Sequence, residues 1–119
     1  MAEIDNITGQ IAAGQSLSPE IDIGTKSLVG LVLPAAWIAA AGGISFQVSV
    51  DGGSTWNELL TVAGAAYAVA FTAAGPAYIA VDPSTLRGVQ AIKVRSGTAG
   101  APVNQTSTVA LTLITRLAL

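Results

Sequence analysis

Glycine, proline and Asp-Gly groups interrupt this sequence at short intervals, and the segments between them are short and rich in aliphatic residues. Short apolar runs at spacings of about 8–12 residues are typical of an all-β sandwich or barrel. We therefore expect an all-β fold: a single antiparallel β-sandwich, jelly-roll-like, with an extended N-terminal segment. The interruptions lie at Gly14, Ser18-Pro19, Gly24, Pro34, Gly42-Gly43, 51–53, Gly64, Gly75-Pro76, 82–84, Gly88, Gly97 and Gly100.

The clearest strand is residues 44–50, where apolar and polar side chains alternate with a period of two. Residues 56–62 are expected to pair back on it across the Asp-Gly-Gly turn. Segments 66–72 and 77–81 are expected to form a second hairpin. The other expected elements are strands at 6–13, 16–23, 27–33, 89–96 and 106–117, a connection at 34–41 and a short helical turn at 83–87.

The chain has 119 residues, which is enough for one hydrophobic core and argues for one domain. We divide it into residues 1–15, an N-terminal arm or first strand, and residues 16–119, the sandwich. Charged residues make up 10% of the chain, where about 25% is usual. Much of the surface must therefore be uncharged, and large exposed apolar patches usually mark interaction sites.

Several chemistries are excluded by residues that the sequence lacks. It has no cysteine and no histidine, so it offers no thiolate, no imidazole base and no Cys or His ligand for a metal. We expect no enzyme activity, no cofactor and no metal. The net charge of −2 does not suit a phosphate backbone, so nucleic acid is not an expected partner.

Two stretches without any charge, 27–50 and 59–81, raise a membrane alternative. Each is long enough to cross a bilayer, which takes about 20 residues, so a small two-span protein of holin type would show this pattern. Pro34 and the alternation in 44–50 argue against a helix in the first stretch. No Lys or Arg cluster flanks either stretch, so we do not expect a membrane as partner.

The sharpest local motif lies at residues 49–56, Ser-Val-Asp-Gly-Gly-Ser-Thr-Trp. It is similar to the Asp box of sialidases and other β-proteins, which implies a folding element away from any active site. Asp-Gly-Gly supplies the positive φ angles of a tight turn, and the carboxylate accepts hydrogen bonds within it. Asp51 and Glu58 are too few acids for calcium. The turn residues are Ser49, Asp51, Gly53, Thr55 and Trp56.

Three groups of residues are candidates for an interface. Ile4, Ile7 and Ile11 lie among polar neighbours in a segment that can add a strand to another subunit. Lys93 and Arg95 alternate with apolar residues and should point outward together, as a partner or small-anion site or as a solvated strand face. Trp37 is either an interface anchor or sugar platform, or a cap on the core.

Six segments together resemble a class of small β-sandwich proteins encoded among the structural genes of tailed phages and gene transfer agents. The resemblance implies a virion accessory protein, a capsid decoration or cement protein, a head-spike base or a tail component. Its partners would be further copies of itself and other virion proteins such as the major capsid protein, and its location the virion, assembled in the host cytoplasm. The segments are 15–18, 33–37, 46–56, 80–83, 86–89 and 92–98.

The alternative is a carbohydrate- or receptor-binding β-sandwich of a phage tail or spike. Such a module needs exposed aromatic side chains on one face or loop. The candidates are Trp37, Trp56, Tyr67 and Tyr78.

Overall fold

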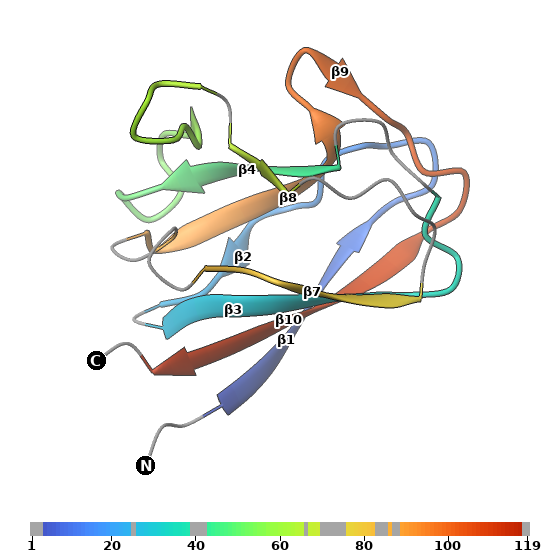
Figure 1. The fold of residues 1–119 in the computed structure, drawn as a ribbon, viewed down its shortest axis with the longest axis horizontal. Coiled ribbons are helices and arrows are strands. Elements are labelled where there is room, and N and C mark those ends of the chain that lie inside the picture. Colours follow the sequence, from blue (N-terminus) through green and yellow to red (C-terminus); the bar gives the residue numbers. More distant parts are fainter. Residues whose placement is uncertain are drawn as a thin grey trace.

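The chain folds into two antiparallel sheets that pack face to face (Figure 1). The computed structural model describes residues 4–24, 26–38, 43–65, 67–69, 76–82, 86 and 89–117, and these contain no helix. The expected all-β sandwich is confirmed. The strands are β1 (Ile4–Ile11), β2 (Ile21–Asp22), β3 (Lys26–Leu33), β4 (Ile44–Ser49), β5 (Asn57–Glu58), β6 (Ala68–Val69), β7 (Ala77–Ala80), β8 (Ala91–Thr98), β9 (Ala101–Pro102) and β10 (Val109–Leu117).

The strand order is that of a jelly roll. One sheet has the order β1-β10-β3-β7 and the other β2-β8-β4-β5, with β6 beside β4 and β9 beside β8. The strands of the first half of the chain pair with those of the second half, as in one long hairpin: β1 with β10, β2 with β8, β3 with β7 and β4 with β5. Successive pairs along this hairpin lie alternately in the two sheets, which gives the two Greek keys of a jelly roll. The N-terminal segment is the first strand of this roll.

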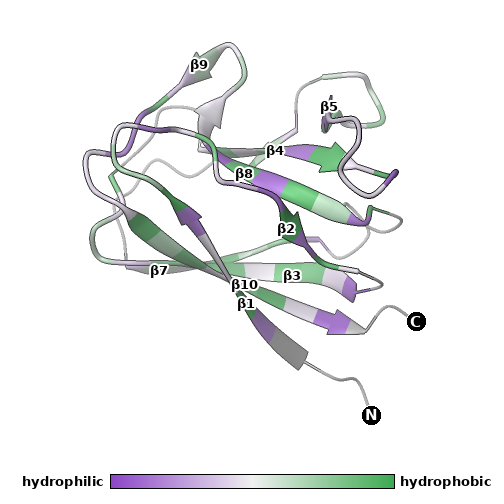
Figure 2. Ribbon diagram, turned by 180° about the vertical axis from the view of Figure 1, so that it is seen from behind, coloured by the Kyte–Doolittle hydropathy of each residue, from purple (hydrophilic) through white to green (hydrophobic). Residues whose placement is uncertain are grey.

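The core lies between the two sheets and is built mainly from the inward sides of the longer strands. The last strand illustrates the pattern, because Leu111 and Leu113 are buried while Ala110 and Arg116 are exposed. Figure 2 shows the alternation as green and purple bands along β4 and β8. The largest buried side chains are Trp37, Phe46, Ile11, Leu28, Leu31, Leu33, Ile44, Leu86, Ile92, Leu111 and Leu113.

The connection after β3 is held to the core by one buried amide. Gln105 is fully buried; its Oε1 accepts from the Ile38 N–H at 2.9 Å, and its Nε2 donates to the Ile38 carbonyl at 3.3 Å. The same Nε2 donates to Ser96 Oγ at 2.9 Å. Because a buried amide is costly unless bonded, these contacts fix the position of Trp37, the neighbour of Ile38.

The expected second hairpin is wrong. β6 pairs with Ile44 and Ser45 of β4, whereas β7 pairs with β3 in the opposite sheet. Sequence neighbours usually pair, but here β7 completes the edge of the other sheet and buries Ile79 against the core. The strand expected at 56–62 is limited to β5, and most of the helical turn expected at 83–87 lies outside the described residues.

Candidate functional site

The turn between β4 and β5 is closed by hydrogen bonds around one carboxylate. Asp51 Oδ1 accepts from Ser49 Oγ at 2.8 Å and from the Thr55 N–H at 3.0 Å, and its Oδ2 accepts from the Thr55 hydroxyl. Ser49 Oγ in turn accepts from the Gly53 N–H at 2.8 Å. Gly53 has a φ of 94°, a conformation that favours glycine. Four of the five residues chosen from the motif thus act together in one turn.

This bonding occupies the Asp51 carboxylate within the turn. It lowers the pKa of Asp51 from 3.8 to about 2, mainly through the side-chain hydrogen bond from Thr55. A carboxylate that accepts several hydrogen bonds is stabilised in its charged form. Among the described residues no three His, Cys, Asp or Glu side chains lie close enough to hold a metal ion. The geometry therefore fits a folding element.

Arg95 is not the solvated or anion-binding side chain considered from the sequence. It is only 6% exposed, because β4 lies on one side of it and Leu17 on the other. Its Nη1 and Nη2 donate to Oε1 and Oε2 of Glu58, each at 2.7 Å. Hydrogen bonding to Arg95 lowers the pKa of Glu58, and the same pair raises the pKa of Arg95.

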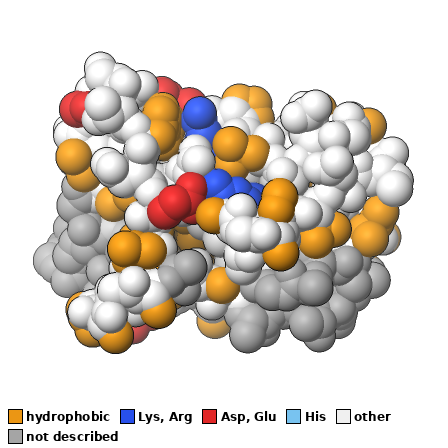
Figure 3. All heavy atoms as spheres, turned by 90° about the horizontal axis from the view of Figure 1, so that it is seen from above, with side chains coloured by type: hydrophobic (Ala, Val, Ile, Leu, Met, Phe, Trp, Pro, Cys, Tyr) orange, Lys and Arg blue, Asp and Glu red, His pale blue; other side chains and the backbone are white. Residues whose placement is uncertain are grey.

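Lys93, two residues before Arg95, also contacts another side chain. Lys93 Nζ lies 4.5 Å from the centroid of the Trp56 ring, the geometry of a cation–π contact. Gln47 on β4 completes the group by donating to Glu58 Oε2 at 2.9 Å. Figure 3 looks onto this side of the molecule and shows acidic and basic side chains meeting in its middle, among hydrophobic and uncharged ones. Lys93 and Arg95, which the sequence offered as interface candidates, thus contact Trp56 and Glu58 within the single chain.

The chain after β5 forms a small hairpin with an apolar tip, residues 60–65. The Tyr67 N–H donates to the Leu59 carbonyl at 2.9 Å, and the Thr61 N–H donates to the Ala65 carbonyl at 2.8 Å. Tyr67 packs against Phe46, with ring centroids 6.0 Å apart, which fixes the base of the hairpin. At the tip, Val62 is completely exposed and Leu60 is exposed. No charged residue lies in the tip.

The sequence interpretation missed this tip as a candidate site. Its residues belong to the uncharged stretch 59–81, for which the sequence suggested strands or a membrane span and no interaction site. Gly64, whose φ of 83° makes the turn, was the signal that an exposed hairpin lies there.

The four-stranded sheet presents an outer face whose centre is uncharged. Register places Thr8, Thr112, Val32 and Tyr78 in one row across all four strands. Because directly opposite residues of antiparallel strands point to the same side, these side chains share the outer face. The next row is Asn6, Ile114, Gly30 and Ala80.

Tyr78 is the aromatic residue of this outer face. It is 59% exposed, and its ring lies so close over Gly30 that a Cβ there would clash with it. The other aromatics considered for sugar binding are less available. Trp37 is 1% exposed, Trp56 lies against Lys93 and Tyr67 packs on Phe46.

The isoleucines proposed for an interface lie along β1. Ile11 is buried in the core, and Ile7 is half-buried and packs against the core. Ile4 lies opposite Arg116 at the start of the strand. The burial of Trp37 and Ile11 leaves almost none of their surface to an outside partner in the single chain.

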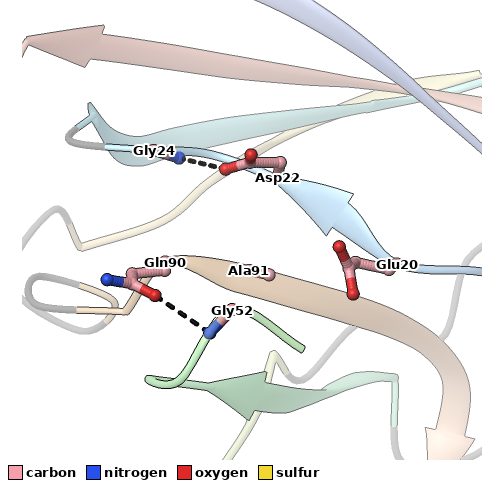
Figure 4. A pocket seen from close by; sticks show the side chains of 6 residues that line it. All are labelled: Glu20, Asp22, Gly24, Gly52, Gln90 and Ala91. Atoms are coloured by element: carbon pink, nitrogen blue, oxygen red, sulfur yellow. Dashed lines mark hydrogen bonds between the residues drawn. The ribbon is translucent and has the colours of Figure 1, made fainter. Parts of the chain in front are cut away.

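An open pocket of about 310 Å³ lies beside the Asp51 turn. Figure 4 shows its lining, in which Gln90 Oε1 accepts from the Gly52 N–H at 3.0 Å and Asp22 Oδ1 accepts from the Gly24 N–H at 2.8 Å. Glu20 lies against Gly53 on the other side. Two carboxylates and one amide give this pocket an acidic lining.

Comparisons with known proteins add no relative: no family model, no curated protein and no solved structure matches the chain. Within the part of the chain that is described, no helix is both long and apolar enough to cross a membrane. The described residues of the first uncharged stretch lie instead in β3, β4 and the connection between them.

Proposed function

We propose that this chain is a non-enzymatic structural protein of a tailed-phage virion that self-assembles and docks on the capsid, as a decoration or cement protein or as a head-spike base. The observation that carries the proposal is the outer face of β1-β10-β3-β7, whose centre is uncharged. Its two central rows contain no charged side chain and include Val32, Ile114 and Tyr78. Protein interfaces are depleted of charge at their centre, and Tyr is enriched there.

The apolar tip supports a second contact, with the shell. A hydrogen-bonded hairpin that exposes Val62 and Leu60 presents about the same shape whether free or bound. Little entropy is then lost when the tip enters an apolar pocket of a partner. The major capsid protein is the partner that this proposal assigns to it. Jelly rolls occur among viral capsid domains, which is an analogy of fold only.

The placement of basic side chains supports a protein partner over nucleic acid. Lys93 is held at Trp56, and Arg95 is paired with Glu58. Neither side chain is free to follow a phosphate backbone, which is bound by clusters of available Lys and Arg. The proposed location is accordingly the virion, assembled in the host cytoplasm, with no membrane partner.

Mass spectrometry of density-purified phage particles from the strain that carries the gene tests this function. We expect peptides of the chain to copurify with the major capsid protein at a fixed copy ratio through successive gradients. Their absence from particles, while the chain is present in the lysate, would overturn the proposal.

A carbohydrate- or receptor-binding module of a tail or spike is the second candidate, and Tyr78 is the observation that favours it. An exposed ring that lies over a glycine of a sheet is a candidate for stacking on a sugar. A glycan array distinguishes the two functions, since specific binding that Tyr78→Ala abolishes would support the module.

A further inference from the structure

The two sheets have edges of very different length. Among the described residues, β7 is an edge of four residues, and the outlying strands of the other sheet, β2, β5, β6 and β9, have two residues each. The remaining edge is β1, whose eight residues pair with β10 on one side only. Short edges are one way in which proteins prevent unwanted strand pairing, and β1 is the exception here.

β1 also lacks two features that protect an edge, a basic or proline residue and a β-bulge. Residues 4–11, Ile-Asp-Asn-Ile-Thr-Gly-Gln-Ile, contain no Lys, Arg or Pro. Its register with β10 runs without a shift from Ile4 to Ile11, whereas the pairing of β10 with β3 is shifted at Ile114/Thr115. The strand therefore offers a regular row of backbone N–H and C=O groups on its open side.

We propose that β1 pairs with β1 of a second copy of this chain, antiparallel and about a two-fold axis. The inference rests on the self-assembly proposed above and names its contact. With a two-fold axis perpendicular to the sheet, the core-facing sides of both copies lie on the same side of the joined sheet. Directly opposite residues of antiparallel strands point to the same side, so the axis must lie where one residue of β1 is opposite the same residue of the second copy.

The side chains of β1 make the strand complementary to itself. Asn6, Thr8 and Gln10 are exposed on the outer side, and each can both donate and accept hydrogen bonds. An axis at Thr8 sets Thr8 against Thr8, a pair that stabilises antiparallel strands. It also sets Asn6 against Gln10, and these two amides can hydrogen-bond to each other. On the inner side, half-buried Ile7 gains cover from the second copy. Asp5, the one acidic residue, lies near the end of the strand.

This pairing joins two four-stranded sheets into one continuous sheet. The outer faces of both copies, with their uncharged centres, then form a single surface, and the two Tyr78 side chains lie near its far edges. The pairing also closes the one long open edge, so that association along this edge stops at two copies.

Light scattering on the eluting protein, in detergent-free buffer and over a wide concentration series, tests the pairing. We expect the wild type to approach twice the chain mass of 11.9 kDa. Thr8→Lys places like charges together on the new strand pair and should weaken the dimer roughly tenfold or more. Ala80→Lys is the matched control: it adds the same charge at an exposed position on β7, the opposite edge of the same sheet, and should leave the dimer intact.

Cross-linking gives a readout that does not depend on charge. The chain contains no cysteine, so a single introduced thiol has no background. Diagonal neighbours on paired strands lie ~7–8 Å apart, so a short bismaleimide should join Thr8→Cys copies even if the axis lies at Ile7 or Gly9. Ala80→Cys should remain uncross-linked.

The outcomes separate this inference from the proposed function. An oligomer with an odd number of copies, or one that Thr8→Lys does not weaken, would overturn the β1 pairing and leave self-assembly standing. A chain that stays monomeric and uncross-linked, yet is found in phage particles, would overturn the pairing and leave the virion role standing. Absence from particles would overturn the virion role whatever the state in solution.

Discussion

Arg95 and Glu58 form a two-pronged ion pair across β4, with both nitrogen–oxygen distances at 2.7 Å. The two partners differ in environment, since Arg95 is buried and the Glu58 side chain is 37% exposed. The pair ties β5, and with it the base of the apolar tip, to the middle of the second sheet. Arg95, an interface candidate from the sequence, therefore has a structural contact within the chain.

Replacing the acid should destabilise the fold more than an ordinary surface change. Glu58→Gln leaves the Arg95 guanidinium without its charged partner, so we expect a loss of about 1–2 kcal/mol in the free energy of unfolding. Exposure of Glu58 to solvent keeps the loss below that of a fully buried pair. Denaturant titration measures it. Glu20→Gln removes the same charge from an exposed acid and should cost under about 0.5 kcal/mol; equal losses would contradict the role of the pair.

The Asp51 turn should titrate at unusually low pH. The pKa of Asp51 is about 2 in the folded chain against an ordinary 3.8, so the ionised form is favoured by folding. Its contribution to stability is therefore complete above about pH 4 and is lost as the pH falls through 2. Carbon-13 NMR of the carboxyl group checks the value. Thr55→Val removes the largest cause and should raise the pKa; an unchanged pKa would show that Thr55 is not responsible.

Trp37 should behave as a core residue in fluorescence and in stability. In a Trp56→Phe background, Trp37 is the remaining tryptophan, and its emission should be blue-shifted and poorly quenched by acrylamide. Trp37→Ala should cost ~3–5 kcal/mol because it leaves a large cavity. Red-shifted, readily quenched emission from the folded protein would return Trp37 to the list of interface residues.

Two glycines with the same backbone conformation should differ in their tolerance of alanine. Gly64 and Gly97 have φ of 83° and 87°, but a Cβ meets nothing within 4 Å at Gly64 and lies 2.5 Å from the Ala101 carbonyl oxygen at Gly97. Gly64→Ala should cost about 1–2 kcal/mol from the backbone alone. Gly97→Ala should cost about 1–3 kcal/mol more from the clash. Thermal unfolding of the two variants gives the comparison, and equal shifts would contradict it.

The apolar tip should contribute to docking and little to folding. Val62→Lys changes a completely exposed side chain, so unfolding should be unaffected within about 0.5 kcal/mol. Binding to capsids assembled from the major capsid protein should fall at least about tenfold, measured by co-sedimentation. Val50→Lys, at another exposed valine, is the control and should bind normally. Equal binding by all three proteins would exclude the tip from the contact.

Local patterns were enough to predict much of this fold. The alternation in residues 44–50 identified β4, because a strand with one face in the core must repeat with a period of two, and the strand expected at 106–117 contains β10. The Asp-Gly-Gly turn was predictable for a related reason, since its conformation and bonding are decided within a few residues.

Pairing over long distances in the sequence was not predictable. Adjacent segments 66–72 and 77–81 suggested a hairpin, yet their described residues pair with β4 and β3 in different sheets. Arg95 lies on the same side of β8 as Lys93, as the alternation predicted. The alternation could not predict that Glu58, on β5, would reach across β4 and form an ion pair with Arg95.

The antiparallel pairing of β1 with β10 has a consequence for how the protein is made. These strands come from opposite ends of the chain, so the centre of the four-stranded sheet cannot form until translation has delivered β10 beyond the ribosomal exit tunnel. Until then, the edges of β1 and β3 that pair with β10 remain unpaired. Pairing between strands so far apart in the sequence favours slow folding, on the scale of about milliseconds to seconds, and leaves these unpaired edges exposed to aggregation until β10 emerges.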